Sequence, residues 1–574
     1  MKKKILALVL AAIMLLTLLT ACGGTTDSNS PGGGQSNNGG GQTNNGGGQT
    51  NNGGNNGGGQ GNTPDTTIVE VSDDFDYSAW VNADGKTVVN VATTADPGTF
   101  DPQQTGASAA LSATQFEGLC HINSVTWEIE PWLAKSFEMS EDGKSVVVEI
   151  YDNITDSKGN HITSSDVAYC YDMAKESGRA NSSSIDHIEI VDEYNLIIHL
   201  TNTQVGVWAT VCHFSIYSQK AYEEGDFAVA PVATGPYVLT NWTPGSSYTF
   251  EKRDDYWQAD ESLVALPSKA NVDIINYMII KEPAQQAIQL ELGDIDMVNG
   301  LSYIEASRFM EGGENEGTRN VFVYDSILAQ LMYLNMSEGS LLAKDLELRK
   351  AIFHAINRAD LILGASNGYG NECVTFGCEA GSVGFLDKWY DEDYYTYDLN
   401  YAKECLANSN YNNEVIRIVS NNSDLKKSQI QLIQLMLNSI GINAECLPYE
   451  DALFNTYKND PNEWEILVDN TSAGAELASM WRRKFDPNNF KNDQGGANFM
   501  HDDELNQLLW TCIDTTTYSD ETVDAFHQAL KERYSAMGLY NPMNFDVCSP
   551  VVVETYNNST GHLLVNACTF VWNK

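Results

Sequence analysis

Apolar runs along the chain predict several short strands. Residues 88–92 and 145–150 are rich in Val and Ile, as expected for strands. The second run follows Asp142-Gly143, a pair that is typical of a tight turn. Thr163 and Asp166 then have the spacing of a capping box, which predicts a helix that continues to about Lys175.

A strand, a helix and a second strand follow one another between residues 415 and 446. Residues 415–419 form an apolar, β-branched run, and Ser423 can cap the helix that follows. One face of that helix carries apolar residues at intervals of three and four, namely Ile430, Ile433, Leu437 and Ile440. Gly441 suits the end of the helix. With a further amphipathic helix over 349–359, this unit predicts an α/β fold with a parallel sheet and at least two lobes.

The N-terminal residues have the order of an export signal. Three lysines precede an apolar run over residues 5–19, which is shorter than a membrane-spanning helix and fits the core of a signal peptide. Small residues then precede Cys22, an arrangement that resembles a bacterial lipobox. We expect residues 1–21 to be removed and the Cys22 thiol to carry a diacylglycerol. An ordinary secretory signal with an incidental cysteine is the alternative.

Residues 23–67 lack large apolar side chains and repeat the sequence Asn-Asn-Gly-Gly-Gly-Gln-Thr. Such a chain cannot bury enough surface to fold, and as a random coil it would span on the order of 35–40 Å. We therefore expect residues 22–67 to tether a folded domain to a membrane. The many glycines argue against the alternative, a Gln/Asn-rich aggregation segment. Residues 68–85 form an extension that the pattern leaves undefined.

The balance of charge is strongly acidic. The 574 residues include 77 acidic and 33 basic side chains, for a formal net charge of −44. Removal of the three N-terminal lysines would leave 30 basic residues and a net charge of −47. This balance argues against nucleic acid as a partner, because phosphate binding needs clustered Lys and Arg. The length and the 42% hydrophobic content are sufficient for more than one packed core.

The chain carries no recognisable catalytic or metal-binding motif. Ten cysteines follow Cys22, and only Cys373 and Cys378 are near enough in sequence to suggest a local disulfide, with free buried thiols as the alternative. The nine histidines are scattered, and zinc spacings, an HExxH helix and a GxSxG elbow do not occur. The residues therefore mark neither a metal nor a cofactor site, and they give an enzyme no support.

Eight short motifs occur in an order that is specific as a set. In the first part of the chain they are 96–102, Glu117-Gly118-Leu119, 130–144 and 159–167. In the later part they are 234–237 with 253–257, then 292–296, 349–358 and 397–406. Together these motifs resemble those of solute-binding protein family 5 of ABC importers, the oligopeptide- and dipeptide-binding group.

The resemblance implies a two-lobed clamp of the periplasmic-binding-protein kind (class C, type II) with a small extra domain. Domain I would comprise residues 86–125, 228–325 and 546–574, domain II residues 126–227, and domain III residues 326–545. Ligand binding would shift an open–closed equilibrium that a membrane permease recognises. No bond would be made or broken.

The resemblance also indicates where a ligand would bind, at Glu117, Gly118, Leu119, Tyr333, Asn335, Asp469, Trp481 and Arg482. The first three are part of a family motif. Tyr333 and Asn335 lie near the start of domain III, and the last three belong to the region of the amino-group clamp. Each has an ordinary structural alternative: a core aromatic, a solvated charge or a turn residue.

One departure from the family concerns that clamp. Many peptide-binding members carry an Asp, in a Trp-x-Ala-Asp-Tyr segment, that pairs with the α-amino group of the peptide. Here the Asp-Tyr is missing and about Ala473 stands in its place. Burying an ammonium without a carboxylate is costly. Either Asp469 or Glu476 therefore replaces the Asp, or the ligand has no such ammonium.

We therefore expect a monomeric, cofactor-free substrate-binding lipoprotein on the outer face of a bacterial cytoplasmic membrane, which passes short peptides to an ABC permease. Peptide binders of this group hold the ligand backbone extended, as in β-augmentation. The alternatives are an oligosaccharide or other polar solute in the same fold, a surface hydrolase, and a subunit that senses a peptide without importing it.

Overall fold

The computed structural model describes residues 66–572, except 70, 72–74, 95, 105–114, 125, 180, 378–381, 473–475, 491–494 and 559–560. The expected signal peptide, Cys22, nearly all of the tether and Cys378 lie outside the described residues. In the 68–85 extension, a 3₁₀ helix (Tyr77–Trp80) positions the Trp80 indole, which donates to Asp296 at 2.6 Å. Within the described part of the chain, no helix has the length and apolar character that crossing a bilayer requires.

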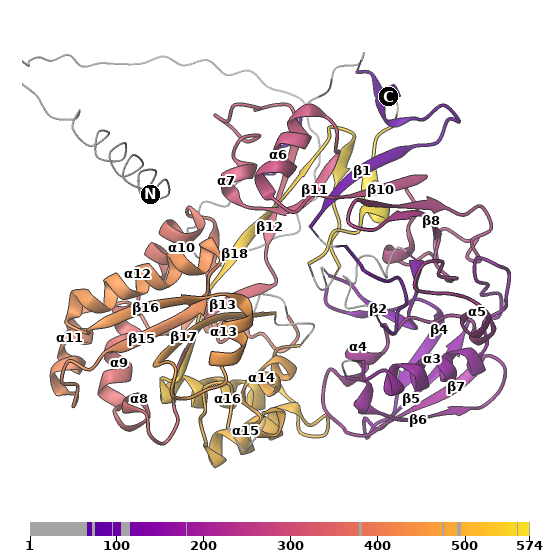
Figure 1. Cartoon of the computed structure of the whole chain (residues 1–574). Coiled ribbons are helices and arrows are strands. Elements are labelled where there is room, and N and C mark those ends of the chain that lie inside the picture. Colours follow the sequence, from indigo (N-terminus) through magenta and orange to yellow (C-terminus); the bar gives the residue numbers. More distant parts are fainter. Residues whose placement is uncertain are drawn as a thin grey trace, which may run out of the picture. The chain divides into compact units, whose positions relative to one another are not determined.

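A twelve-stranded sheet runs through most of the described chain, in the order β16-β15-β17-β13-β18-β11-β1-β10-β9-β8, with β12 and β14 also paired to β18 (Figure 1). Its first half contains β1 (Val88–Thr93), β8 (Tyr237–Thr243), β9 (Ser247–Lys252), β10 (Ile274–Ile279), β11 (Met297–Leu301) and β12 (Asn320–Asp325). β1 is parallel to β10 and β11. Its residues alternate, so that Val89 and Val91 join one core cluster while Ala92 joins another.

The two faces of this first half are covered differently. Helices α6 (Pro283–Leu292) and α7 (Tyr303–Ala306) contribute to the cluster on one face. On the other, the C-terminal segment with β19 (Val552–Glu554) and β20 (Thr569–Phe570) supplies buried residues such as Val551, Leu563 and Cys568. The last part of the chain therefore completes the core that the first strand begins.

The second half of the sheet contains β13 (Leu328–Leu334), β14 (Gly370–Glu372), β15 (Ile416–Asn421), β16 (Ala444–Tyr449), β17 (Ile466–Ser472) and β18 (Ala536–Cys548). One face packs against α9 (Leu346–Ala355), α10 (Arg358–Ser366), α11 (Leu399–Asn408) and α12 (Asp424–Ile440), near α8 (Leu341–Lys344). The other packs against α13 (Asp451–Tyr457), α14 (Leu477–Phe485), α15 (Asp503–Ile513) and α16 (Asp520–Arg533). Strand residues alternate between these faces, as with Met332 on the first and Tyr333 on the second.

β18 belongs to both halves. Its residues 536–540 pair with β13, while residues 543–548 pair with β12. The chain passes from β12 to β13 through residues 326–327. The two halves of the sheet are therefore connected by a two-residue link and by one continuous strand.

A separate four-stranded antiparallel sheet has the order β4-β5-β7-β6. It is built from β4 (Ala134–Met139), β5 (Ser145–Ile150), β6 (Ile185–Ile190) and β7 (Asn195–Leu200), and α3 (Ser164–Glu176) packs on it. One face is buried and the other is open, since Val146 and Val148 are fully buried whereas Val147 is 49% exposed. The short elements β2 (Cys120–Ile122), β3 (Ile129–Pro131), α4 (Val207–Val211) and α5 (Gln219–Glu224) flank it.

Most elements predicted from the sequence pattern are confirmed. Thr163 and Asp166 form the capping box of α3. Ser423 caps α12, Gly441 ends it with a φ of 102°, and β15 and β16 are parallel. The helix predicted over 349–359 is found as α9, but it ends at Ala355. The Asn357 side chain accepts from the Asp360 N–H and begins a new helix.

Glu117 is fully buried and joins three distant segments of the chain. Its Oε1 accepts from Tyr256 Oη and Ser268 Oγ, each at 2.6 Å, and from Trp132 Nε1 at 3.1 Å. Its Oε2 accepts from Trp257 Nε1 at 2.9 Å. Four donors on one carboxylate compensate the cost of burying it.

Gly118 and Leu119 continue this tightly packed segment. A Cβ on Gly118 would lie 2.5 Å from the Cα of His213, so the position has no room for a side chain. Leu119 is fully buried, and its carbonyl accepts from the Trp132 and Ala134 N–H groups at 2.9 Å. The Glu-Gly-Leu segment therefore holds the small sheet against the first half of the large one.

Replacing Glu117 with Ala is expected to lower the free energy of unfolding by about 3 kcal/mol or more, because Tyr256, Trp257 and Ser268 lose the acceptor of their donated hydrogen bonds. Trp132 Nε1 keeps Ser268 Oγ as an acceptor. Glu117→Gln is expected to be destabilising as well, since its amide adds a donor where an acceptor is needed. Urea denaturation measures both, and exposed Glu128→Ala is the control, expected within about 0.5 kcal/mol of wild type. Wild-type stability in Glu117→Ala would contradict the structural role.

Candidate functional site

The carboxyl ends of three parallel strands meet at one edge of the second half of the large sheet. β15 is parallel to both β16 and β17, so all three strands end on the same side. Ser472, at the end of β17, pairs with Leu328 at the start of β13. This edge therefore lies beside the 326–327 link. Open α/β sheets bind ligands at edges of this kind.

Asp469 lies near this edge among basic side chains. Lys458 Nζ is 3.7 Å from Asp469 Oδ2. Lys426 Nζ donates to the Asp469 carbonyl at 2.6 Å and to Gln330 Oε1 at 2.7 Å. Burial lowers the pKa of Lys426 to about 7, and burial also lowers the pKa of Lys484, an effect that nearby Asp469 opposes. Three amines thus lie near Asp469, and one of them, Lys458, pairs with its carboxylate, in a chain that is acidic overall.

Glu476 directly precedes α14 and is only 7% exposed. Its backbone pairs with Val383 in a parallel bridge. Its Oε2 is buried and has no hydrogen-bond partner among the described residues. Burial raises the pKa of Glu476 to about 8. The carboxyl is therefore mostly protonated at pH 7.

A loop before α4 covers Glu476. The Val205 N–H donates to the Ile513 carbonyl at 2.7 Å, and the Thr515 N–H donates to the Thr203 carbonyl at 2.8 Å. Gly206, with a φ of 76°, approaches so closely that a Cβ on it would lie 2.4 Å from Glu476 Oε2. The shielding of Glu476 from water therefore depends on a glycine in this loop.

Two of the predicted ligand residues lie in the core behind this edge. Tyr333 is 1% exposed, with its ring 5.3 Å from that of Phe376. Trp481 is fully buried and donates to the Phe376 carbonyl at 3.0 Å. Both positions are typical of packing residues, and a ligand contact by either stays a prediction.

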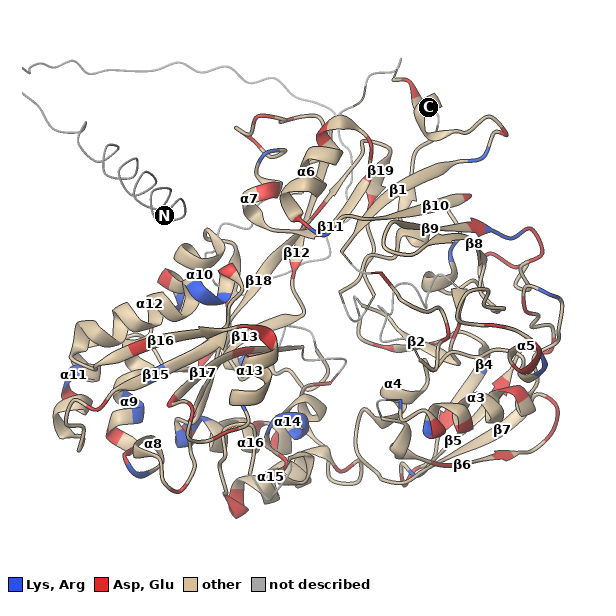
Figure 2. Cartoon of the chain, viewed as in Figure 1, with Lys and Arg blue, Asp and Glu red and all other residues tan. Residues whose placement is uncertain are grey.

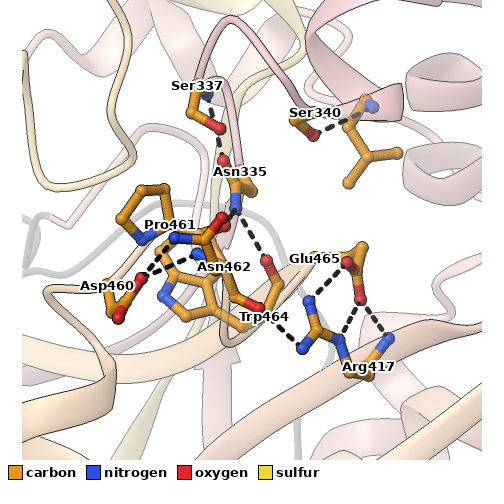
Figure 3. Close-up of polar contacts among 10 residues, drawn as sticks. Asn335, Ser337, Ser340, Arg417, Asp460, Pro461, Asn462, Trp464 and Glu465 are labelled. Carbon is orange, nitrogen blue, oxygen red and sulfur yellow. Dashed lines mark hydrogen bonds and ion pairs between the residues drawn. The ribbon is translucent and has the colours of Figure 1, made fainter.

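Asn335 is 2% exposed and fixes the segment that leads into β17 (Figure 3). Its Nδ2 donates to the carbonyls of Pro461 and Trp464, each at 2.7 Å, and its Oδ1 accepts from the Ser337 N–H at 3.0 Å. These bonds use the polar atoms of its amide within the fold, so a ligand contact by Asn335 also stays a prediction.

Next to Asn335, Figure 3 shows Arg417 and Glu465 as a two-pronged ion pair. Arg417 Nε and Nη2 donate to the two carboxylate oxygens, each at 2.8 Å. The backbone N–H of Arg417 also donates to Glu465 Oε2, at 2.8 Å. This pair holds β15 against the start of β17 and so supports the strand that carries Asp469.

The remaining predicted residues divide between surface and interior. Arg482 is partly exposed and belongs to the basic last turn of α14, which Figure 2 marks in blue. Cations there also interact favourably with the end of the helix. Glu117, Gly118 and Leu119 are buried in the architecture described above, and a ligand contact by any of them stays a prediction.

Sequence reasoning missed Lys426, Lys458 and Gly206. A signal for Lys426 was present, because it lies four residues before Ile430 and thus on the apolar face of α12, where a cation is unexpected. Lys458 and Gly206 had no local signal, since their roles come from segments distant in sequence. The structure shows no metal-binding cluster of three His, Cys, Asp or Glu among the residues it describes.

Comparison with known proteins agrees with this architecture. Residues 128–491 match the family described as "Bacterial extracellular solute-binding proteins, family 5 Middle". The chain is 22% identical over 470 residues to the probable D,D-dipeptide-binding periplasmic protein DdpA of Escherichia coli (strain K12), covering 78% of this chain and 86% of that one.

Solved structures share the fold. NikA from Brucella suis, in complex with Fe(III)-EDTA, has a TM-score of 0.72 at 19% identity, over 84% of this chain and 100% of that one. The oligopeptide-binding protein AppA from Bacillus subtilis, in complex with a nonapeptide, has a TM-score of 0.62 at 16% identity, over 84% and 99%. The family match extends over more than half of the sequence. The chain therefore belongs to family 5 of the bacterial extracellular solute-binding proteins, the non-catalytic substrate-binding proteins of ABC transporters.

Proposed function

We propose that this protein captures short peptides and delivers them to an ABC permease. The observation that carries the proposal is the Glu476 carboxyl, which is buried just after β17 and whose Oε2 has no hydrogen-bond partner in the described part of the chain. The α-ammonium of a peptide would supply the missing cation and form a charge-assisted hydrogen bond. Two similar proteins, DdpA, a probable D,D-dipeptide-binding protein, and AppA, in complex with a nonapeptide, support a peptide ligand.

Glu476 is a better amino-group clamp than Asp469. Asp469 already has Lys458 as an ion-pair partner, and Lys426 and Lys484 lie near it. An ammonium placed there would compete with Lys458 for the carboxylate. Glu476 lies three residues after the position where family members carry their Asp, close enough for a longer side chain to take over the role.

The basic group around Asp469 suits the opposite end of the ligand. Lys426, Lys458 and Lys484 bring three amines to one carboxylate, and Arg482 lies on the same helix as Lys484. A ligand carboxylate would balance this surplus. We propose Asp469 and Arg482 as parts of this subsite, so that an extended peptide finds a complementary charge for each of its ends.

Capture would use the connection between the halves of the large sheet. We propose domain I as 86–125, 228–325 and 546–574, domain II as 126–227 and domain III as 326–545, with movement at residues 326–327 and in the middle of β18. The contact of the Gly206 loop with residues 513–515 would form as the clamp closes. A ligand would favour this closed state by its greater affinity for it.

A lipid anchor would keep the protein at the membrane. We propose that Cys22 is the lipidated N-terminus of the mature chain and that residues 23–67 are the tether. The support is the order of lysines, apolar run, small residues and cysteine in the sequence. A monomer held in this way on the outer face of the cytoplasmic membrane stays close to its permease.

A second candidate is an anionic polar solute that is not a peptide. The surplus of amines around Asp469 favours it, and NikA, of the same fold, holds Fe(III)-EDTA. Such a ligand would not need Glu476. The two candidates therefore differ in what they require of that residue.

Protein without residues 1–65, purified gently and then denatured, is expected to release a set of short-peptide masses, because a closed clamp retains its ligand. Mass spectrometry of the released fraction measures this. Protein that was unfolded, dialysed and refolded beforehand is the control and should release none. A single non-peptide mass would favour the second candidate instead.

Peptide affinity is expected to rise with pH, by about tenfold per unit between pH 6 and 7. Free Glu476 holds its proton up to about pH 8, and an ammonium binds only the ionised form, so binding must release that proton below this pH. Titration calorimetry over this range measures the slope. Glu476→Gln should bind weakly without this rise in affinity with pH, and an N-acetylated peptide should lack the rise with wild type.

Glu476→Gln is not expected to lower the melting temperature, because it removes a carboxyl group whose ionised form is disfavoured by burial. A thermal melt of the ligand-free variant checks this and separates lost binding from unfolding. Peptide binding by Glu476→Gln with the wild-type affinity and slope would rule out Glu476 as the clamp.

Wild-type protein in its native bacterial envelope is expected to begin at Cys22 and to carry a diacylglycerol on that thiol. Intact-mass measurement of the membrane fraction tests this. Cys22→Ser should abolish the lipid mass, whereas Cys446→Ser, in β16, should retain it. An unmodified N-terminus at another residue would establish the ordinary secretory alternative.

A further inference from the structure

Two cysteines from distant parts of the chain lie side by side in the core next to the small sheet. Cys120 begins β2, and Cys212 ends α4. The Cys120 N–H donates to the Cys212 carbonyl at 3.0 Å. The two thiols are also close enough for each to influence the pKa of the other. Backbones joined by one such bond lie within the Cα separation that a disulfide spans.

The packing around this pair is close. Both cysteines are fully buried in one hydrophobic cluster. Two residues before Cys120, Gly118 has no space for a Cβ because the His213 backbone lies 2.5 Å from its position. The segments therefore cannot move apart without disturbing this contact, so the two sulfurs stay in place.

The chemistry at Cys212 favours the nucleophile of thiol–disulfide exchange. Burial raises the pKa of Cys212, but hydrogen bonds from the Cys120 thiol and the His213 side chain outweigh this effect and lower it to about 6. The Cys120 pKa is raised, chiefly by burial and then by Cys212. The His213 side chain is exposed, which gives a proton from Cys212 a route to solvent. A thiolate next to a thiol is the pairing that exchange requires.

We propose that Cys120 and Cys212 form a disulfide in the exported protein. The thiolate of Cys212 attacks an oxidised disulfide of the thiol–disulfide oxidoreductase or glutathione class and forms a mixed disulfide. The Cys120 thiol then attacks the Cys212 sulfur and passes its proton to the departing thiolate, which leaves as the reduced thiol of the reagent. The protein loses two electrons and two protons, and the reagent's disulfide is reduced to two thiols.

This bond would close the chain around the small sheet. Residues 121–211 include β4, β5, β6, β7 and α3, so the disulfide joins the strand that leads into this unit to the helix that leaves it. Such a closure stabilises the fold chiefly by restricting the unfolded chain. It is independent of the identity of the ligand.

Cys170 provides a matched control within the same cluster. It is also fully buried, but its Sγ donates to the Tyr217 carbonyl at 3.3 Å and accepts from the Tyr217 N–H at 3.3 Å. Burial raises its pKa. Cys170 is therefore as buried as Cys120 and Cys212, but its thiol is hydrogen-bonded to the backbone of Tyr217. We expect it to stay reduced.

The test uses the full exported chain, equilibrated with a glutathione redox buffer, then denatured and alkylated without reductant. Peptide mass spectrometry is expected to show Cys120 and Cys212 unlabelled and linked, with a mass two hydrogens below the sum of the two peptides, and Cys170 labelled. The proposal would be overturned if both cysteines were fully alkylated before reduction. A reference disulfide protein, oxidised in the same buffer, shows that the buffer is able to form the bond.

A second measurement compares oxidised with reduced wild-type protein, so its main result does not require a variant to fold. Dithiothreitol is expected to lower the melting temperature of the wild-type protein by several degrees and to leave that of Cys120→Ser/Cys212→Ser unchanged. The variant Cys170→Ser should keep the wild-type response to the reductant. Equal melting temperatures for oxidised and reduced wild type would show that no stabilising bond had formed.

Discussion

The buried carboxylate of Glu117 is the interaction on which the arrangement of the described chain depends. Its four donors come from Trp132, at the entry to the small sheet, and from Tyr256, Trp257 and Ser268, in the connection between β9 and β10. A carboxyl group in the interior needs hydrogen-bond donors to offset its loss of water. The segments that supply the donors are therefore fixed relative to one another.

Glu117 and Glu476 show the two ways in which a carboxyl can be buried. Glu117 has a full set of donors and is a structural anchor. Glu476 has no hydrogen-bond partner for its Oε2 among the described residues, and burial raises its pKa to about 8. Polar groups left unsatisfied in the interior concentrate at functional sites. Glu117, a motif residue, thus has all its hydrogen bonds within the fold, whereas Glu476, outside every motif, is the proposed clamp.

Local signals in the sequence were enough for most of the secondary structure. The capping box at Thr163, the cap at Ser423 and the glycine at 441 each act within a few residues, and each is found as predicted. The break at Asn357 was missed because its cap lies inside a continuous apolar pattern. The eight motifs identified the family because they follow the whole chain rather than one element.

The candidate site was less accessible to sequence reasoning, for a physical reason. Asp469, Lys426 and Lys458 come from β17, α12 and the end of α13, and they meet only because parallel strands end at one edge. Gly206 covers Glu476 from more than 250 positions away in the chain. The motif glycines illustrate the same point, since Gly235 packs directly on the Gln115 carbonyl and would place a Cβ 2.2 Å from it. In the sequence, such a contact is visible only as a glycine, and nothing nearby indicates which distant residue packs against it.

The position of β18 has a consequence for biogenesis. This strand, residues 536–548, lies between β13 and β11 in the middle of the sheet order, yet it is almost the last part of the chain to be synthesised. Neither half of the sheet can be completed until it has emerged, because both β12 and β13 pair with it. Contacts between residues so far apart in sequence form slowly. A chain that must cross a membrane unfolded would thereby gain time for translocation before its central strand closes the fold.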